Sequence, residues 1–319
     1  MLYGALTILI VLAVGLIWLA IRLRAGGRIA RFAGIPLVGL LAVVASLASG
    51  LTAAGIYKLH ARTAPLADLK VEGRPEQIRR GASLAASFCA ACHSKTGTLS
   101  GGFDLANDIP IPIGSFVSSN LTPAGVLPNW TDGEIFRAIR NGVDAEGNWL
   151  FIMSLTRAGR LSDDDTHALI AYIRSLPASG KATASPPDQL SLLGAVMLGA
   201  GMLPPPKPVF TGVVTAPAKG PTREYGEYIL SYQDCRECHG AKLTGGVPGQ
   251  LAPIGPGLAI VKDWTLEQFI STLRTGIDPT GHELSPQMPW RPFGTMDDQE
   301  LEAMYRYLVS LSGETTSSN

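Results

Sequence analysis

The chain is 319 residues long, which suggests about two domains of ordinary size. Its 26 basic and 26 acidic residues give a net charge of zero, which argues against nucleic acid as a partner because nucleic-acid binding favours a basic surface. Four cysteines are far too few for a fold that disulfides hold together.

The first sixty residues contain two long uncharged segments. Residues 2–21 and 32–57 are rich in Leu, Val, Ala and Gly, and each is long enough to cross a bilayer core of about 30 Å at about 1.5 Å per residue. The connector between them holds no acid and four arginines: Arg22, Arg24, Arg28 and Arg31. A short basic connector is typical of the cytoplasmic side of a membrane. We therefore predict a transmembrane helical hairpin over residues 1–58.

This hairpin would anchor the chain in the cytoplasmic (inner) membrane and leave the remaining residues on its periplasmic, outer face. The charge rule alone does not decide the orientation, because basic residues also follow the second segment. These are Lys58, Arg62, Lys70 and Arg74. The alternative for residues 28–55 is a secretory signal, since they combine a basic start, an apolar core and small residues.

The rest of the chain divides at proline-rich segments. Residues 177–188 and 203–222 have the Pro, Ala and Ser content of linkers. Between them, residues 190–203 form an apolar run that is short for a membrane span. This run could lie on the membrane surface, pack against a domain or a partner, or form an ordinary buried helix. We assign residues 75–180 and 223–313 to two domains, joined by a linker over residues 181–222.

These two domains repeat one another in sequence. The clearest match is Cys89-Ala-Ala-Cys92-His93, which recurs as Cys235-Arg-Glu-Cys238-His239. The further matches, in the same order, are Leu99 to Gly102 with Leu243 to Gly246, Trp130-Thr131 with Trp264-Thr265, Arg140 to Asp144 with Arg274 to Asp278, and Tyr172 to Leu176 with Tyr307 to Leu311. Matches that keep their order along the chain indicate a duplicated domain.

Helices dominate the pattern of both domains. The expected helices are residues 75–88, 131–141 and 162–176 in the first domain and residues 223–234, 265–275 and 297–311 in the second. Thr131 and Thr265 can cap the helices that they begin. Acidic residues in the first turn, as after Ser162, complement the helix dipole. Because no strand alternation is evident, we predict an all-α protein.

The repeated Cys-x-x-Cys-His sequence is the attachment motif for c-type haem. Its two thiols form thioethers with the vinyl groups of the haem, and the histidine that follows binds the iron. A redox dithiol does not require that histidine, and a structural zinc site would bring the two cysteine pairs together. We therefore predict two covalently bound haems, one held by Cys89 and Cys92 and the other by Cys235 and Cys238.

A methionine precedes the last helix of each domain and could supply the second axial ligand. Methionine opposite histidine is usual in electron-transfer haem proteins and raises the potential. Met153 and Met288 are 135 positions apart, the same offset as the final helices. We therefore predict that His93 and Met153 bind one iron, and that His239 and Met288 bind the other.

Other residues could take the place of these methionines. Met296 falls at the start of the last helix, where a core or capping role fits better. Met153 could be a packed core residue, because no proline follows it as Pro289 follows Met288. The alternative histidine ligands are His60, His167 and His282.

Both domains resemble class I c-type cytochromes. Ser119 to Pro123, Trp130 to Asp132, Arg140 to Asp144 and Leu161 to Pro177 are similar to segments of the cytochrome c subunits of membrane-bound alcohol, aldehyde and gluconate dehydrogenases. This resemblance implies three to five helices around each haem, an exposed haem edge and haem attachment outside the cytoplasm. Those subunits usually carry three haems, a C-terminal anchor and a proline after the ligand methionine, whereas this chain has two motifs, an N-terminal hairpin and Ser154.

These observations favour an electron-transfer protein without catalytic residues. We predict a hairpin followed by two tandem cytochrome c domains, relaying electrons in a respiratory chain between other subunits of a membrane redox complex or dehydrogenase and a soluble carrier or oxidase. One alternative is the dihaem subunit of a haem–copper oxidase. A dihaem peroxidase would need one iron with an open position, which two methionine ligands would not leave.

Overall fold

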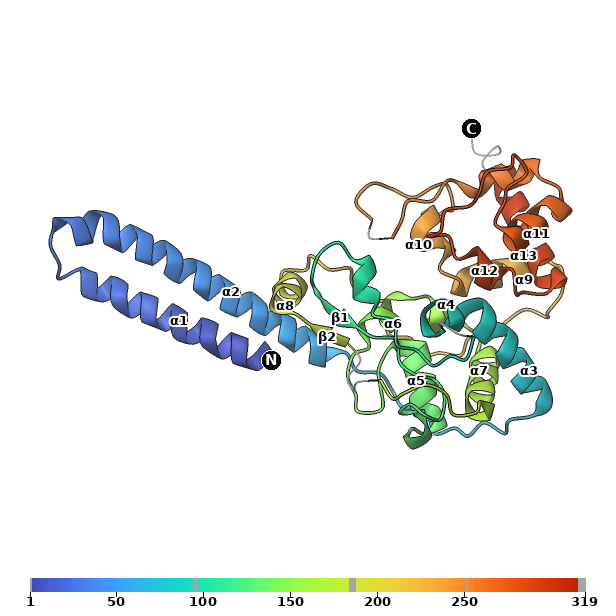
Figure 1. Cartoon of the computed structure of the whole chain (residues 1–319), viewed down its shortest axis with the longest axis horizontal. Coiled ribbons are helices and arrows are strands. Elements are labelled where there is room, and N and C mark those ends of the chain that lie inside the picture. Colours follow the sequence, from blue (N-terminus) through green and yellow to red (C-terminus); the bar gives the residue numbers. More distant parts are fainter. Residues whose placement is uncertain (1, 95–96, 184–187, 251, 315–319) are drawn as a thin grey trace.

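A helical hairpin projects from a two-lobed soluble part (Figure 1). The computed structural model describes residues 2–94, 97–183, 188–250 and 252–314. Residues 184–187 of the predicted linker lie outside the described residues. Helices dominate these described ranges, which confirms the predicted class.

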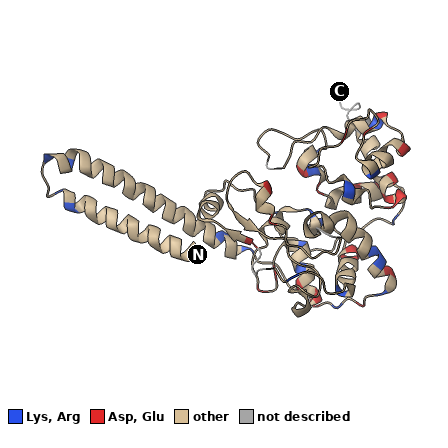
Figure 2. Cartoon of the chain, in the orientation of Figure 1, with Lys and Arg blue, Asp and Glu red and all other residues tan. Residues whose placement is uncertain are grey.

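The hairpin consists of α1 (Leu2–Leu23) and α2 (Ile35–Ala61), with a π-helical turn (Ala30–Gly34) before α2. Both helical segments, of 22 and 32 residues, are long and apolar enough to cross a membrane. Figure 2 shows arginines at the turn of the hairpin and no charged residue along most of its shaft. At the other end, the Tyr3 hydroxyl lies 3.0 Å from Nε2 of His60.

The first domain is built on a helix that leads directly into the first cysteine motif. This helix is made of α3 (Pro75–Leu84), a π-helical turn (Ala85–Cys89) and α4 (Ala90–His93). The remaining helices are α5 (Asp132–Asn141), α6 (Phe151–Leu155), α7 (Asp163–Ser175) and the 3-10 turns Leu105–Asp108, Leu127–Asn129 and Ala158–Arg160. α3 packs across α7 with no room for a side chain at Gly81, where a Cβ would lie 1.9 Å from the carbonyl oxygen of Ala168.

The second domain repeats this arrangement. Its elements are α9 (Arg223–Tyr232), α10 (Cys235–His239), a 3-10 helix (Leu258–Asp263), α11 (Leu266–Thr275), α12 (Trp290–Phe293) and α13 (Asp298–Glu314). α9 packs across α13, and a Cβ on Gly226 would lie 1.9 Å from the carbonyl oxygen of Ala303. The same close helix crossing therefore occurs in both domains.

Local geometry also repeats where the sequence repeats. Thr131 and Thr265 each form a capping box at the start of α5 and α11, which confirms the predicted caps. Both helices end on a glycine with a left-handed backbone, Gly142 at φ 63° and Gly276 at φ 76°. Only glycine adopts this conformation without strain, so the repeated Arg-x-Gly sequence is a helix stop.

The segment between the domains folds back onto the first domain and the hairpin. β2 (Asp188–Leu190) pairs antiparallel with β1 (Gly114–Phe116), and α8 (Leu192–Gly199) packs against α2. Further along, the backbone N–H of Lys207 donates to the carbonyl oxygen of Ser154 at 2.9 Å. The two short strands were not predicted, because three residues are too few to show alternation.

The two domains share one hydrophobic core. Buried residues of α3 and α7, such as Leu84 and Leu169, belong to the same cluster as Tyr228 and Tyr232 of α9. Phe88 meets Tyr232 edge to face across the boundary, with ring centroids 6.1 Å apart. This continuity fixes the position of one domain against the other.

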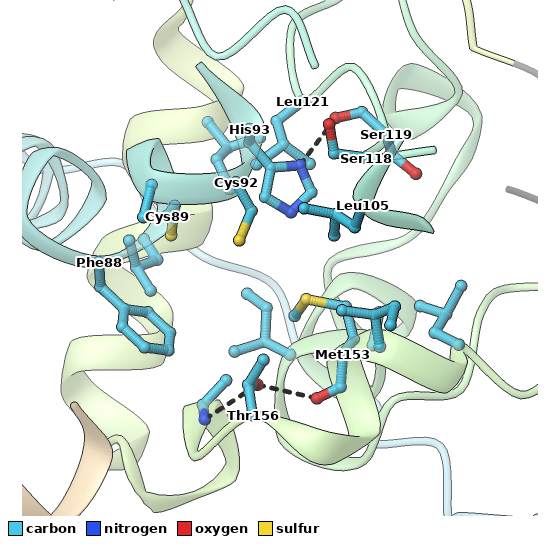
Figure 3. A pocket seen from close by; sticks show the side chains of 18 of the residues that line it. Phe88, Cys89, Cys92, His93, Leu105, Ser118, Ser119, Leu121, Met153 and Thr156 are labelled. Carbon is cyan, nitrogen blue, oxygen red and sulfur yellow. Dashed lines mark hydrogen bonds between the residues drawn. The ribbon is translucent and has the colours of Figure 1, made fainter. Parts of the chain in front are cut away.

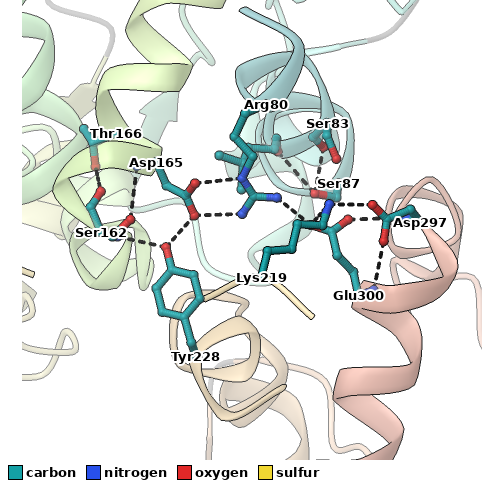
Figure 4. A network of polar contacts seen from close by, with 11 residues as sticks. Arg80, Ser83, Ser87, Ser162, Asp165, Thr166, Lys219, Tyr228, Asp297 and Glu300 are labelled. Atoms are coloured by element: carbon teal, nitrogen blue, oxygen red, sulfur yellow. Dashed lines mark hydrogen bonds and ion pairs between the residues drawn. The ribbon is translucent and has the colours of Figure 1, made fainter. Parts of the chain in front are cut away.

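A buried polar network reinforces the boundary (Figure 4). Arg80 of α3 forms an ion pair with Asp165 of α7 at 2.7 Å and a second ion pair with Glu300 of α13. The Tyr228 hydroxyl donates to Asp165 at 2.6 Å and accepts from the backbone N–H of Ser162. Because the guanidinium of Arg80 pairs with both carboxylates and the Tyr228 hydroxyl donates to Asp165, these buried charges are compensated.

Candidate haem sites

The first cysteine motif opens into an apolar cavity. The cavity has a volume of about 180 Å³ and is open to solvent at its mouth. Its lining includes Cys89, Cys92, His93 and Met153. Figure 3 shows the His93 ring and the Met153 side chain pointing into this space from opposite sides, with both thiols beside it. Burial raises the pKa of the Cys89 thiol to about 12 and lowers the pKa of His93.

The second motif opens into a larger cavity of about 700 Å³, also open to solvent. Cys235, Cys238, His239 and Met288 all line it. Each set of predicted haem residues is thus gathered around one cavity, although the methionine of each set lies far along the sequence from its cysteine motif.

Both histidines are oriented in the same way. Nδ1 of His93 lies 2.8 Å from the carbonyl oxygen of Ser119, and Nδ1 of His239 lies 2.7 Å from that of Pro256. A carbonyl accepts only, so each Nδ1 carries the proton and each Nε2 keeps its lone pair. A hydrogen bond of this kind prepares an imidazole to bind a metal.

The loops that directly follow the two cysteine motifs also have the same backbone geometry in both domains. Leu99 and Leu243, which follow the two motifs, both have positive φ, at 53° and 60°. Each is buried and accepts a backbone hydrogen bond, from Leu121 in the first domain and Leu258 in the second. Their burial in the shared core compensates for the unfavourable backbone conformation.

Met153 lies in α6, and Ser154 has a structural role of its own. The Ser154 hydroxyl is buried, donates to the carbonyl oxygen of Phe151 and accepts from the Trp149 indole at 2.6 Å. These contacts hold the methionine segment without a proline. In the second domain the turn is held by the Met288 N–H, which donates to Ser285, and by Pro289.

The alternative ligands lie elsewhere. Met296 is 1% exposed and packs in the shared core. The His167 ring packs at a tilt against Phe136, with ring centroids 5.7 Å apart, and His60 contacts Tyr3. The backbone N–H of His282 donates to Asp278 on the surface. Among the described residues that line the two cavities, none of these four occurs.

The two cavities share part of their walls. The residues that line both are Ile152, Thr156, Asp234, Pro289 and Phe293. A single layer of side chains therefore separates the cavities at this point. This adjacency depends on the packed domain boundary and could not be predicted from either domain alone.

Three residues of the first cavity were missed by the sequence analysis. Asp188 of β2 lines the cavity, and the backbone N–H groups of Phe151 and Ile152 at the start of α6 favour its charged form. Burial raises the pKa of Asp188, and likewise that of Asp234, to about 6. The third residue, Gln233, is 1% exposed and its amide nitrogen has no hydrogen-bond partner among the described residues.

These features fit a c-type haem. Each cavity presents two thiols, an oriented imidazole, a thioether and apolar walls, which are the groups that such a haem requires. The unpaired amide of Gln233 offers a donor to a polar group bound in the first cavity. A buried amide without a partner is costly in a closed protein, so this one also indicates a bound group.

Replacing Asp188 should loosen the methionine side of the first cavity. In Asp188→Ala the N–H groups of Phe151 and Ile152 lose the carboxylate with which they interact, which should destabilise α6 by about 1 kcal/mol. We expect carbon monoxide to bind the reduced protein to a greater extent. Asp188→Asn retains an acceptor oxygen and is the matched control, expected to stay close to the native protein. Equal carbon monoxide binding in all three proteins would contradict this positioning role.

Two family models match the soluble part of the chain. Residues 76–173 match the model described as cytochrome c oxidase, cbb3-type, subunit III. Residues 224–312 match the model described as cytochrome c. Each match contains one cysteine motif and its cavity methionine.

Curated relatives include subunits of several dehydrogenases. A subunit of the nicotinate dehydrogenase of Pseudomonas putida is 27% identical over 266 residues, which cover 74% of this chain and 21% of the relative. The cytochrome c subunit of alcohol dehydrogenase (quinone) of Gluconobacter oxydans is 31% identical over 97 residues, 26% of this chain and 20% of the relative. Its counterpart in Komagataeibacter europaeus is 27% identical over 272 residues, 73% of this chain and 56% of the relative. The matched stretches thus span from about a fifth to just over half of these relatives.

Proposed function

Because this chain is an electron-transfer c-type cytochrome with two cytochrome c domains, we propose that it carries two covalent haems and relays electrons through both. The observation that carries this proposal is the pair of cavities with a common wall, each lined by a cysteine motif and a methionine. Haem supplies an iron that cycles between ferrous and ferric states.

The histidine, methionine and cysteine side chains of each cavity would restrict the haem to electron transfer. His93 and His239 would bind the irons through Nε2, since their Nδ1 atoms are engaged with carbonyls. Met153 and Met288 would also bind the irons, through their thioether sulfurs, and so exclude small molecules. The cysteines would hold each haem covalently, and the shared wall of Ile152, Pro289 and neighbouring residues would keep the two haems close.

We propose that the hairpin anchors this relay in the cytoplasmic membrane, with both domains on the periplasmic face. The apolar helices and the arginine-rich turn support this orientation. An anchor raises the effective concentration of the haem domains near a membrane partner, so that little affinity is needed at the surface where electrons are exchanged.

The proposed donor is a membrane-bound dehydrogenase, since several relatives are cytochrome subunits of dehydrogenases. The electrons would pass to a downstream soluble carrier or oxidase. A second candidate is a subunit of a haem–copper oxidase complex. The match of residues 76–173 to the cbb3-type subunit III model favours this second candidate.

Copurification distinguishes the two candidates. The chain, tagged at its C-terminus and extracted in mild detergent, should bring down a dehydrogenase subunit, and substrate of that enzyme should reduce its haems. The same pull-down after washing at high salt is the control for loosely bound proteins. A copper-containing oxidase in place of a dehydrogenase would support the second candidate, and isolation of the chain without any redox partner would contradict both.

A further inference from the structure

The helix α8 lies beside the hairpin but belongs to the segment between the two haem domains. Figure 1 shows α8 nearly end-on, whereas α1 and α2 run across the view. α8 thus lies across the hairpin rather than along it. No residue from Leu192 to Gly199 is charged or polar.

Contacts between backbones fix α8 to α2. A Cβ on Gly55 would lie 2.0 Å from the carbonyl oxygen of Ala195, and a Cβ on Gly199 would lie 1.9 Å from that of Leu51. Lys58 caps the end of α8, because its Nζ donates to the carbonyl oxygen of Leu198 at 2.9 Å. α8 therefore sits at a defined height, opposite residues 51–58 of α2.

Residues 51–58 of α2 correspond to the outer edge of the bilayer. From Phe32, next to the arginine-rich turn, about 20 residues at about 1.5 Å each cross a hydrocarbon core of about 30 Å. This distance ends near Thr52. Residues 51–58 then lie between the edge of the hydrocarbon and the headgroups, the depth at which interfacial helices lie.

The side of α8 that faces away from the protein is apolar. Leu192 and Leu193 are 39% and 45% exposed. The neighbouring loop adds Ile111, which is 42% exposed, and the Ser191 hydroxyl joins the two by donating to the carbonyl oxygen of Pro112 at 2.8 Å. We refer to Leu192, Leu193 and Ile111 as the α8 patch.

We propose that the α8 patch inserts into the outer leaflet of the membrane as a third, non-spanning attachment. The occupant is lipid because α8, which carries the patch, packs against α2, and the hairpin beside it exposes large apolar side chains such as Leu47. This inference rests on the proposed membrane anchor. Together with the Lys58 cap, the patch would prevent the haem domains from tilting about the end of α2.

A nitroxide at Leu193→Cys tests this proposal in the full chain with its haems attached. The protein is reconstituted in vesicles of phosphatidylethanolamine and phosphatidylglycerol, and relaxation of the label by lipid-soluble oxygen is compared with relaxation by a water-soluble nickel chelate. The haem-linked native cysteines would not react, so the label is confined to one site. Ile111→Cys is the second variant of the patch. Ile8→Cys, in the shaft of α1, and Val247→Cys, on the second domain, serve as lipid and water controls.

Labels at residues 193 and 111 should resemble the label at residue 8, with oxygen more effective than nickel. Values like those at residue 247 would place the patch in water and overturn the proposal. Protection from both relaxants would mean that protein covers the patch, and this would overturn it too. The label at residue 8 separates these outcomes from failure of the anchor itself, because a hairpin outside the membrane would also expose that label to nickel.

Discussion

The variant Gly226→Ala should unfold the second haem domain at markedly lower denaturant than the native protein. The added methyl group would lie 1.9 Å from the carbonyl oxygen of Ala303 and 2.9 Å from Cβ of Tyr307, where α9 crosses α13. Neither atom is the end of a flexible side chain, so one helix has to move. Overpacking a core typically costs about 1–3 kcal/mol, and we expect a backbone clash to reach or exceed the top of that range. Urea unfolding in detergent, followed by the absorption of the covalent haem, measures the change.

Two further variants define this prediction. Gly81→Ala should have a similar effect on the first domain, because its methyl group would lie 1.9 Å from the carbonyl oxygen of Ala168. Gly220→Ala is the matched control: the nearest atom to its Cβ is 3.9 Å away, in the side chain of Thr222. If Gly226→Ala unfolds at the same urea concentration as Gly220→Ala, the helices do not cross at this distance.

The sequence repeat predicted the helix caps of both domains because a cap is a local feature. Thr131 and Thr265 are caps in the structure as predicted, and the helix before the first motif begins at Pro75 as expected. A cap depends on its own side chain and on the N–H group three residues later. Such features leave a signature within a few positions of sequence.

The relations between the domains leave no such signature. Arg80 and Glu300 are 220 positions apart. From the sequence alone, each would be assigned to the exposed surface of its helix. Asp188 likewise lies in a segment with linker composition, yet it reaches the helix that carries Met153. Contacts of this kind arise from tertiary packing, so the common wall of the two cavities could be found only in the structure.

The proposed methionine ligands lead to the prediction with the largest effect on redox behaviour. In Met288→Ala the second haem should remain attached, because Cys235 and Cys238 are unchanged. Its iron should bind carbon monoxide when reduced, since the cavity loses the thioether of Met288. The reduction potential of this haem should fall, because methionine ligation raises it. The choice of axial ligands changes haem potentials over a range of about 0.8 V. Intact mass, carbon monoxide spectra and a redox titration test the three statements.

Met296→Leu is the control for Met288→Ala. Met296 is buried in the shared core, so leucine should change stability slightly and leave the spectrum and the potential as they are. Met153→Ala should affect only the first haem, which makes the two titration steps assignable. If Met288→Ala keeps the native spectrum and potential while Met296→Leu loses them, the ligand is Met296. The second domain would then hold its haem differently from the first, despite the equal spacing of Met153 and Met288.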